Sequence, residues 1–251
     1  MKVRPLYPHA ALLVEDDRRY IVVTDLHIGL EAELINKGIS MPSIVPSMAD
    51  QLLQLVEREQ ADAIVLLGDV KHSVSSISKQ EWDEIPVFFR RLVAKADVYV
   101  VPGNHDGNIR HLLPPNVISV SVKGMTIGGD TLLVHGHSMP SDVRSNVTRI
   151  IMGHVHPVFV KRGSTVNGER VWIYMQARRT ALFPSTAEEG TIEIIVVPSF
   201  NPHLYVSGDH YYKKSISPII TRVIQSGVDR CVVATLDGSV VGDVAMLQNI
   251  L

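Results

Sequence analysis

Five short polar clusters contain the side chains of this sequence that could carry out chemistry. Each follows an apolar run, and they are Asp25-Leu26-His27, Gly68-Asp69, Gly103-Asn104-His105-Asp106, His135-Gly136-His137 and Gly153-His154-Val155-His156. A lone His or Gly-Asp pair after a strand is usually a turn residue, but five such clusters in one chain indicate a shared site. Carboxylate, amide and imidazole ligands without thiolate suit manganese, iron, zinc and similar ions, whereas calcium and magnesium sites use oxygen alone. The sequence therefore predicts a metal centre.

The number of candidate ligands favours two ions. The clusters offer more ligands than one tetrahedral ion takes, and a central carboxylate such as Asp69 can bridge a pair. Two ions about 3.5–4 Å apart can clamp the attacking and leaving oxygens of a phosphoryl displacement. A protein nucleophile is not indicated, because the sequence has no Gly-x-Ser-x-Gly elbow and its one Cys, Cys231, is remote from the clusters in sequence.

Predicted strands place these clusters at one edge of a sheet. Apolar runs over residues 21–23, 63–67 and 98–101 alternate with amphipathic helices expected over 43–60 and 79–96. Strand–helix–strand connections of this length imply parallel neighbours, whose carboxyl ends meet at the same edge. After Gly107 the sequence predicts shorter strands with little helix, over residues 117–122, 125–127, 131–134, 149–152, 158–160, 171–175 and 191–197.

The length, composition and charge of the sequence limit the kinds of protein that it can encode. With 251 residues, 45% of them hydrophobic, we expect a single globular domain over 1–251, in which 200–251 form a C-terminal β-rich extension. That extension includes a hairpin over 231–241 with an Asp237-Gly238 turn. An exposed strand edge there could pair two chains as a homodimer. The net charge of −2 gives no overall basic field for nucleic acid or an anionic membrane.

Localisation is predicted from segments that the sequence lacks. Residues 1–20 are too polar for a signal peptide, and no stretch approaches the roughly 18 apolar residues of a membrane span. A single Cys suits a reducing environment. We therefore expect a cytoplasmic protein with no membrane partner.

The ordered series DLH, GD, GNHD, HGH and GHVH resembles the calcineurin-like metallophosphoesterase superfamily over residues 25–156. This resemblance implies an α/β fold, a four-layer α-β-β-α sandwich of two mixed sheets. The stretches DLHIGLEAELINKGISMP, GDVKH, PSF and SISPII are similar to an archaeal branch related to the bacterial ligase-associated phosphoesterases.

The resemblance also implies a role for each motif residue. The ligands would be Asp25, His27 and His156 on the first metal, Asn104, His135 and His154 on the second, and Asp69 on both. His105 resembles the family's non-ligand histidine, which stabilises the pentacoordinate phosphorus or protonates the leaving oxygen, and Asp106 would fix its tautomer. His72 and His137 are expected behind the ligands, with a surface-loop histidine as the alternative for His72.

The implied function is a dinuclear phosphoesterase that hydrolyses phosphodiester bonds by a metal-bridged hydroxide, as a nuclease or phosphodiesterase linked to DNA repair. Manganese is the expected metal, with iron, zinc or nickel as alternatives, and the partner is a phosphoester substrate such as DNA. Two other functions stay open: a small-molecule phosphoesterase for nucleotides or metabolites, and a non-catalytic protein-interaction scaffold. Candidate phosphate-contacting cations are Lys71, Arg110, Arg144, Lys161, Arg162, Arg178 and Arg179.

Overall fold

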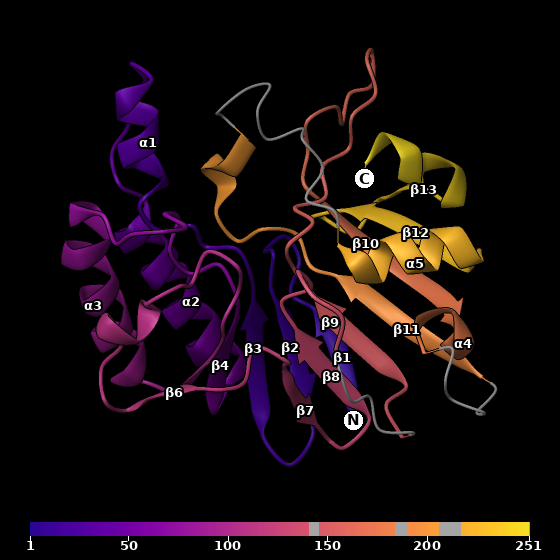
Figure 1. The fold of residues 1–251 in the computed structure, drawn as a ribbon, viewed down its shortest axis with the longest axis horizontal. Helices are drawn as coiled ribbons and strands as arrows, with labels where there is room; N and C mark the ends of the chain where they lie inside the picture. Colours follow the sequence, from indigo (N-terminus) through magenta and orange to yellow (C-terminus); the bar gives the residue numbers. More distant parts are fainter. Residues whose placement is uncertain (141–145, 184–189, 206–216, 251) are drawn as a thin grey trace.

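Two mixed β-sheets pack face to face and carry helices on their outer faces (Figure 1). The computed structural model describes residues 1–140, 146–183, 190–205 and 217–250. Helices α2 (Val45–Glu59) and α3 (Lys79–Val93) cover the first sheet, and α5 (Pro218–Ser226) lies against the second. The expected four-layer α-β-β-α sandwich is thus confirmed.

The first sheet has the order β1-β2-β3-β4-β5-β6. Its strands are β1 (Lys2–Pro5), β2 (Leu12–Glu15), β3 (Arg19–Val23), β4 (Ala63–Leu67), β5 (Asp97–Val101) and β6 (Val117–Ser119). Strands β3 to β6 are parallel, whereas β1 and β2 run antiparallel to their neighbours. Every residue of β4 is buried, as expected for a strand covered on both faces.

The second sheet has the order β13-β12-β10-β11-β9-β8-β7. Its strands are β7 (Met125–Ile127), β8 (Thr131–Val134), β9 (Arg149–Met152), β10 (Val171–Arg178), β11 (Thr191–Val196), β12 (Val228–Thr235) and β13 (Val240–Gly242). Strands β8, β9 and β11 are mutually parallel, so their carboxyl ends also share an edge. The remaining pairs are antiparallel.

Apolar side chains from both sheets fill the space between them. Val22 and Val65 of the first sheet belong to the same buried cluster as Ile151, Trp172 and Ile195 of the second. This packing fixes the two sheets relative to each other. The motifs at their strand ends are therefore held together by the core.

Several short elements were not expected from the sequence. They are β1, helix α1 (Leu30–Asn36), helix α4 (Arg179–Leu182) and the 3₁₀ turns Ile109–His111, Pro202–Tyr205 and Val244–Asn249. The expected strand over 158–160 is reduced to one bridge between Val158 and Arg170. Helix α3 runs on through Pro86, and its start is fixed by a capping box between Ser78 and Glu81.

The C-terminal segment is built into the second sheet. Strand β12 pairs with β10, and the expected hairpin is present as β12 and β13. The expectation of a β-rich extension missed α5, although Ser217 followed by Pro218 is a typical helix start. No helix among the described residues is long and apolar enough to cross a membrane.

Candidate metal centre

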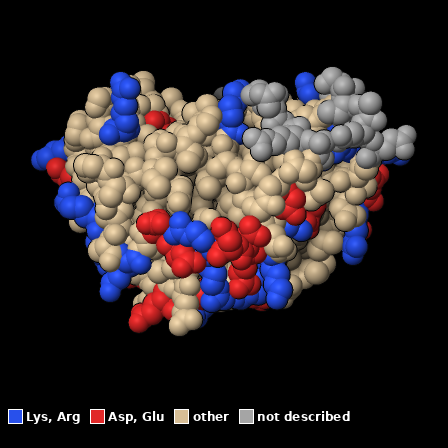
Figure 2. Space-filling view, turned by 90° about the horizontal axis from the view of Figure 1, so that it is seen from below, with Lys and Arg blue, Asp and Glu red and all other residues tan. Residues whose placement is uncertain are grey.

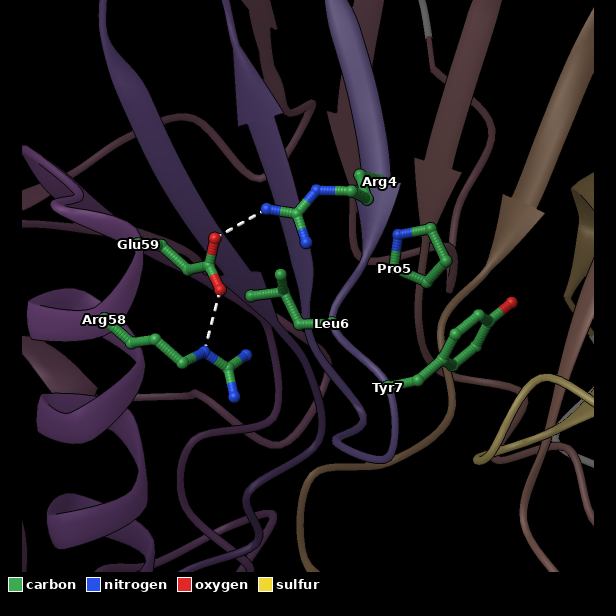
Figure 3. Close-up of a pocket in the computed structure, with 6 residues that line it drawn as sticks. All are labelled: Arg4, Pro5, Leu6, Tyr7, Arg58 and Glu59. Carbon is green, nitrogen blue, oxygen red and sulfur yellow. Dashed lines mark hydrogen bonds and ion pairs between the residues drawn. The ribbon is translucent and has the colours of Figure 1, made fainter.

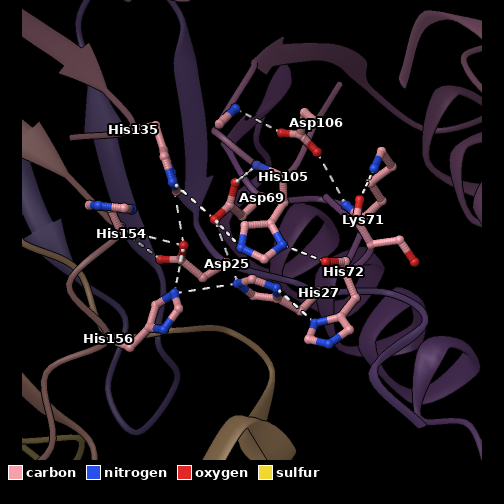
Figure 4. Close-up of polar contacts among 12 residues, drawn as sticks. Asp25, His27, Asp69, Lys71, His72, His105, Asp106, His135, His154 and His156 are labelled. Carbon is pink, nitrogen blue, oxygen red and sulfur yellow. Dashed lines mark hydrogen bonds and ion pairs between the residues drawn. The ribbon is translucent and has the colours of Figure 1, made fainter. Parts of the chain in front are cut away.

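The predicted ligands converge where parallel strands of both sheets end (Figure 4). Asp25 and His27 follow β3, Asp69 follows β4, and His135 follows β8. His154 and His156 follow β9. Backbone hydrogen bonds continue the pairing past the ends of β3 and β4, from the Asp25 amide to the Gly68 carbonyl (3.1 Å) and from the His27 amide to the Asp69 carbonyl (2.9 Å). The strand register therefore sets Asp25 beside Asp69.

Five of these residues adopt the left-handed backbone conformation, with φ between 45° and 70°: Asp25, His27, Asp69, His154 and His156. In the described part of the chain, only Gln60 and Asn108 are further non-glycine residues with positive φ. This conformation is uncommon for residues with a Cβ, and it concentrates at functional sites. The sharp turns aim side chains from several strand ends at one point.

Neighbouring residues hold the Asp25 turn. Thr24 Oγ1 lies 2.8 Å from the Leu67 carbonyl and 2.7 Å from the Asp25 carboxylate. The His154 amide donates to Asp25 Oδ2 at 3.0 Å, which ties the two sheets together. Asn201, beyond β11, donates from its side chain to the Leu26 carbonyl at 2.8 Å. Thr24 and Asn201 were not identified from the sequence, because neither belongs to a motif that marks a ligand.

The first group of potential ligands comprises Asp25, His27, Asp69 and His156, each with one donor atom within 4.8 Å of the others. His156 Nε2 lies 3.0 Å from Asp25 Oδ1 and 3.4 Å from His27 Nε2. His27 Nε2 lies 3.7 Å from Asp69 Oδ2. Two carboxylates and two imidazoles thus point at one small volume.

The second group comprises Asp69, His135 and His154. His135 Nδ1 is 2.9 Å from the Leu67 carbonyl, so it carries the proton and leaves a lone pair on Nε2. His135 Nε2 lies 3.2 Å from Asp69 Oδ2, yet it is buried without a hydrogen bond. A buried nitrogen with a free lone pair beside a carboxylate fits a metal ligand.

The charges of the site also fit cations. Burial would raise the pKa of Asp25, but His156 and His135 hold it at about 2. Burial would likewise lower the pKa of His135, yet Asp69 and Asp25 raise it to about 9, so a proton takes the place of the cation on Nε2 when no metal is bound. The two buried carboxylates therefore need positive charge beside them. The donor set fits a pair of divalent ions with Asp69 common to both groups.

Asn104 is the predicted ligand that follows β5. Its side chain is exposed on the loop after β5. The next residue anchors that loop to the site, because the His105 amide donates to Asp69 Oδ1 at 2.8 Å. The assignment of Asn104 to the second metal stays a prediction.

The expected partnership of His105 with Asp106 is wrong. The Asp106 carboxylate accepts backbone hydrogen bonds from Val70 (2.9 Å), Lys71 (3.2 Å) and Gly103 (2.8 Å). Burial and the charge of Asp69 raise the pKa of Asp106 to about 6. His105 Nδ1 instead donates to the backbone carbonyl of His72. Asp106 is occupied in joining the loop after β5 to the turn after β4, so a carbonyl sets the His105 tautomer.

The two remaining histidines lie behind the ligands. His72 is buried, and its Nδ1 is 3.2 Å from His27 Nδ1. His137 is partly buried, with its ring centre 5.4 Å from that of His135. Burial lowers the pKa of both histidines. The surface-loop alternative for His72 therefore does not match its burial.

Two of the candidate phosphate-binding cations are not accessible. Lys71 is fully buried and donates to the Ser73 and Ser76 carbonyls, and Arg179 is buried and donates to the Val147 carbonyl. These side chains satisfy buried carbonyls, so they are not available to contact a phosphate. The exposed candidates are Arg110, Lys161, Arg162 and Arg178, whereas Arg144 lies outside the described residues.

Other surfaces offer weaker candidates. The groove in Figure 3 contains two guanidinium groups paired with one carboxylate, Arg4–Glu59 at 2.5 Å and Arg58–Glu59 at 2.8 Å, and contains none of the predicted ligands. The face in Figure 2, seen from below, intermixes acidic and basic side chains. Neither surface presents a concentrated charge of one sign.

Gly68, between β4 and Asp69, should not tolerate a side chain. Its φ is +83°, and a Cβ there would overlap the His135 ring. Gly163 has nearly the same φ of +82° but open space around its Cβ position. We expect Gly163→Ala to cost about 1–2 kcal/mol of unfolding free energy from backbone strain alone. Gly68→Ala should lose the same amount from strain and about 1–3 kcal/mol more of unfolding free energy from overpacking.

The test is urea unfolding of both variants, with metal affinity measured by calorimetry. Gly68→Ala should also weaken metal binding, because the displaced ring is a predicted ligand, and Gly163→Ala should not. Equal losses of stability with unchanged metal affinity in both variants would contradict the tight contact between Gly68 and His135.

The sandwich and its strand-end cluster of Asp and His define an α/β protein with a candidate metal site. The chain belongs to the calcineurin-like phosphoesterase family, whose sequence profile matches residues 18–158. The crystal structure of nuclease MPE from Pseudomonas putida has a similar fold, with a TM-score of 0.56 and 18% identity over 96% of this chain and 100% of that one. The structure of YfcE, a phosphoesterase from E. coli, compares with a TM-score of 0.42 and 15% sequence identity, over 90% of this chain and 98% of that one.

Proposed function

We propose that this phosphoesterase is dinuclear and hydrolyses phosphodiester bonds in nucleic acid. The position of Asp69 is the observation that carries the proposal. Its Oδ2 lies 3.2 Å from His135 Nε2 and 3.7 Å from His27 Nε2, so one carboxylate belongs to both ligand groups. A bridging carboxylate suits two adjacent ions better than two separate sites.

The site residues divide the chemistry between them. Two divalent ions bound there would supply Lewis acidity and lower the pKa of a coordinated water toward neutrality. His105 lies at the rim, with its side chain 22% exposed and its Nε2 4.0 Å from Asp69 Oδ2. Because Nδ1 donates to the His72 carbonyl, Nε2 is the nitrogen that can take up a proton and then deliver it to a leaving oxygen.

The segment after His156 supports a polyanionic substrate. Residues 157–170 form a hairpin-like loop that extends beyond the sheets on the same side as α1 (Figure 1). This loop carries the exposed cations Lys161 and Arg162. Exposed cations on a loop that starts directly after a predicted ligand would neutralise backbone phosphates that flank the scissile bond. A nuclease of this kind would act in DNA repair, with manganese as the working metal.

A panel of substrates tests the proposal. We expect chelated protein to be inactive and Mn²⁺ to restore hydrolysis of DNA and of a small phosphodiester, bis(p-nitrophenyl) phosphate. RNA, nucleotides and a phosphomonoester are assayed beside them at the same salt concentration. Replacing Lys161 and Arg162 together by Ala should raise KM for DNA and leave kcat/KM for the small diester unchanged.

Three outcomes would contradict parts of the proposal. A preference for the monoester of about tenfold or more, which corresponds to about 1.4 kcal/mol, would overturn the nuclease assignment in favour of a small-molecule phosphoesterase. An unchanged KM for DNA in the double variant would remove the loop from the substrate site. No turnover with any divalent ion would favour the scaffold.

A further inference from the structure

A chain of three side chains leads from the surface to the first group of ligands. His72 Nε2 lies 2.7 Å from Glu33 Oε2, and His72 Nδ1 lies 3.2 Å from His27 Nδ1. Glu33 comes from α1, His72 from the turn after β4, and His27 from the turn after β3. Figure 4 shows the contact between the two imidazoles, with His27 between His72 and His156.

Hydrogen-bond chemistry fixes the proton positions along this chain. An ionised carboxylate only accepts, so His72 must carry its proton on Nε2 and donate it to Glu33. A neutral His72 then has its lone pair on Nδ1, and His27 must donate from its own Nδ1. His27 Nε2 is left with a free lone pair. A metal bound through Nε2 uses that lone pair, so a metal-bound His27 carries its proton on Nδ1, toward His72.

His27 Nε2, which carries no proton in this arrangement, is the nitrogen that faces the other ligands. His27 Nε2 is 3.4 Å from His156 Nε2 and 3.7 Å from Asp69 Oδ2. A carboxylate behind a ligating histidine fixes its tautomer and orientation and makes the metal-bound nitrogen more basic. Here the Glu33 carboxylate does not contact His27 directly, because the His72 imidazole lies between them and bonds to both.

The backbone around the chain holds its members in place. The buried Glu81 carboxylate accepts from the His72 amide at 3.0 Å and from the Ser73 amide at 2.6 Å. Helix α1 begins at Leu30, directly after the His27 turn, and its N-cap Gly29 packs so closely on Glu81 that a Cβ would lie 2.8 Å from Glu81 Cγ. Glu33 and His72 are therefore set against each other by the start of α1 and the first turn of α3.

We propose that Glu33 and His72 are positioning residues that hold His27 in its metal-binding tautomer and strengthen its bond to the first ion. The inference rests on the proposed dinuclear function. His72 has a second task, because its backbone carbonyl accepts from His105. Substitutions at Glu33 leave that carbonyl in place. They therefore test the effect of the Glu33–His72 pair on His27 without disturbing the hydrogen bond that holds His105.

Nitrogen-15 NMR of the zinc-loaded full chain, labelled at histidine, reads the proton positions directly. We expect a proton on His27 Nδ1 and on His72 Nε2, with zinc on His27 Nε2. A proton on His72 Nδ1, or zinc on either ring nitrogen of His72, would overturn the proposal. A wild-type chain that binds no divalent ion would overturn both this inference and the proposed function.

Zinc calorimetry of variants gives the energetic test. Glu33→Ala should weaken the first site by about 10–100-fold, the loss typical of residues behind a ligand. Glu33→Gln should lose less, because its amide oxygen still accepts from His72. Glu57→Gln, an exposed position on α2, is the matched control and should bind as wild type. If wild type binds two ions and Glu33→Ala binds them equally well, this inference fails while the proposed function stands.

Discussion

Asp69→Asn is expected to weaken metal binding in both ligand groups and to abolish hydrolysis. Asp69 is buried and belongs to both groups, and its Oδ2 approaches His135 and His27. Asn keeps an Oδ1 that can accept from the His105 amide, so the loop after β5 stays anchored. It removes the negative charge that two cations would share. The loss of affinity should exceed the about 10–100-fold typical of residues behind a ligand.

A manganese titration followed by metal analysis measures this effect, and circular dichroism checks that the variant is folded. Asp83→Asn is the matched control, because Asp83 is exposed on α3 away from the site. It should bind metal and turn over substrate as wild type does. Retention of both ions at wild-type affinity by Asp69→Asn would show that Asp69 does not bridge.

His105→Ala should lower kcat by about 10²–10⁴-fold, the range of general acid–base catalysis. The ring is placed for proton transfer, with Nδ1 bound to the His72 carbonyl and Nε2 4.0 Å from Asp69 Oδ2. KM should change little, and metal content should stay at the wild-type value. Steady-state kinetics with Mn²⁺ and metal analysis of the same sample provide the measurement.

The control for this substitution is His111→Ala, since His111 is exposed in the 3₁₀ turn that follows the same loop. Its kcat should match wild type. Loss of an ion from His105→Ala would instead assign His105 as a ligand, a role that its position beside His27 and His72 would permit. A kcat within about threefold of wild type would remove His105 from the chemistry, since general acid–base catalysis contributes far more.

Much of the architecture could be predicted because each motif follows an apolar, largely buried strand. The continuous apolar run of Ala63–Leu67 requires a strand covered on both faces, and the carboxyl end of such a strand is where Asp69 stands. Helix α1 could not be predicted, since seven residues give too short a periodic pattern. Because α1 was not predicted, Glu33 was not recognised as a residue near the site.

Partners of the motif residues were harder to predict than the residues themselves. Asp106 is adjacent to His105 in sequence, yet neighbouring side chains on a turn need not face each other. The backbone amides of Val70, Lys71 and Gly103 surround the Asp106 carboxylate. The carbonyl that holds His105 leaves no trace in sequence, because every residue has one. Such contacts depend on three-dimensional packing.

The manganese titration of the wild-type chain tests the central claim most directly when it is followed by electron paramagnetic resonance. Two ions about 3.5–4 Å apart on a shared carboxylate should give a stoichiometry of two per chain and the spectrum of a spin-coupled Mn²⁺ pair. Asp69→Asn should lose that coupled signal. One ion per chain at saturation, or two with uncoupled spectra, would contradict a dinuclear centre bridged by Asp69.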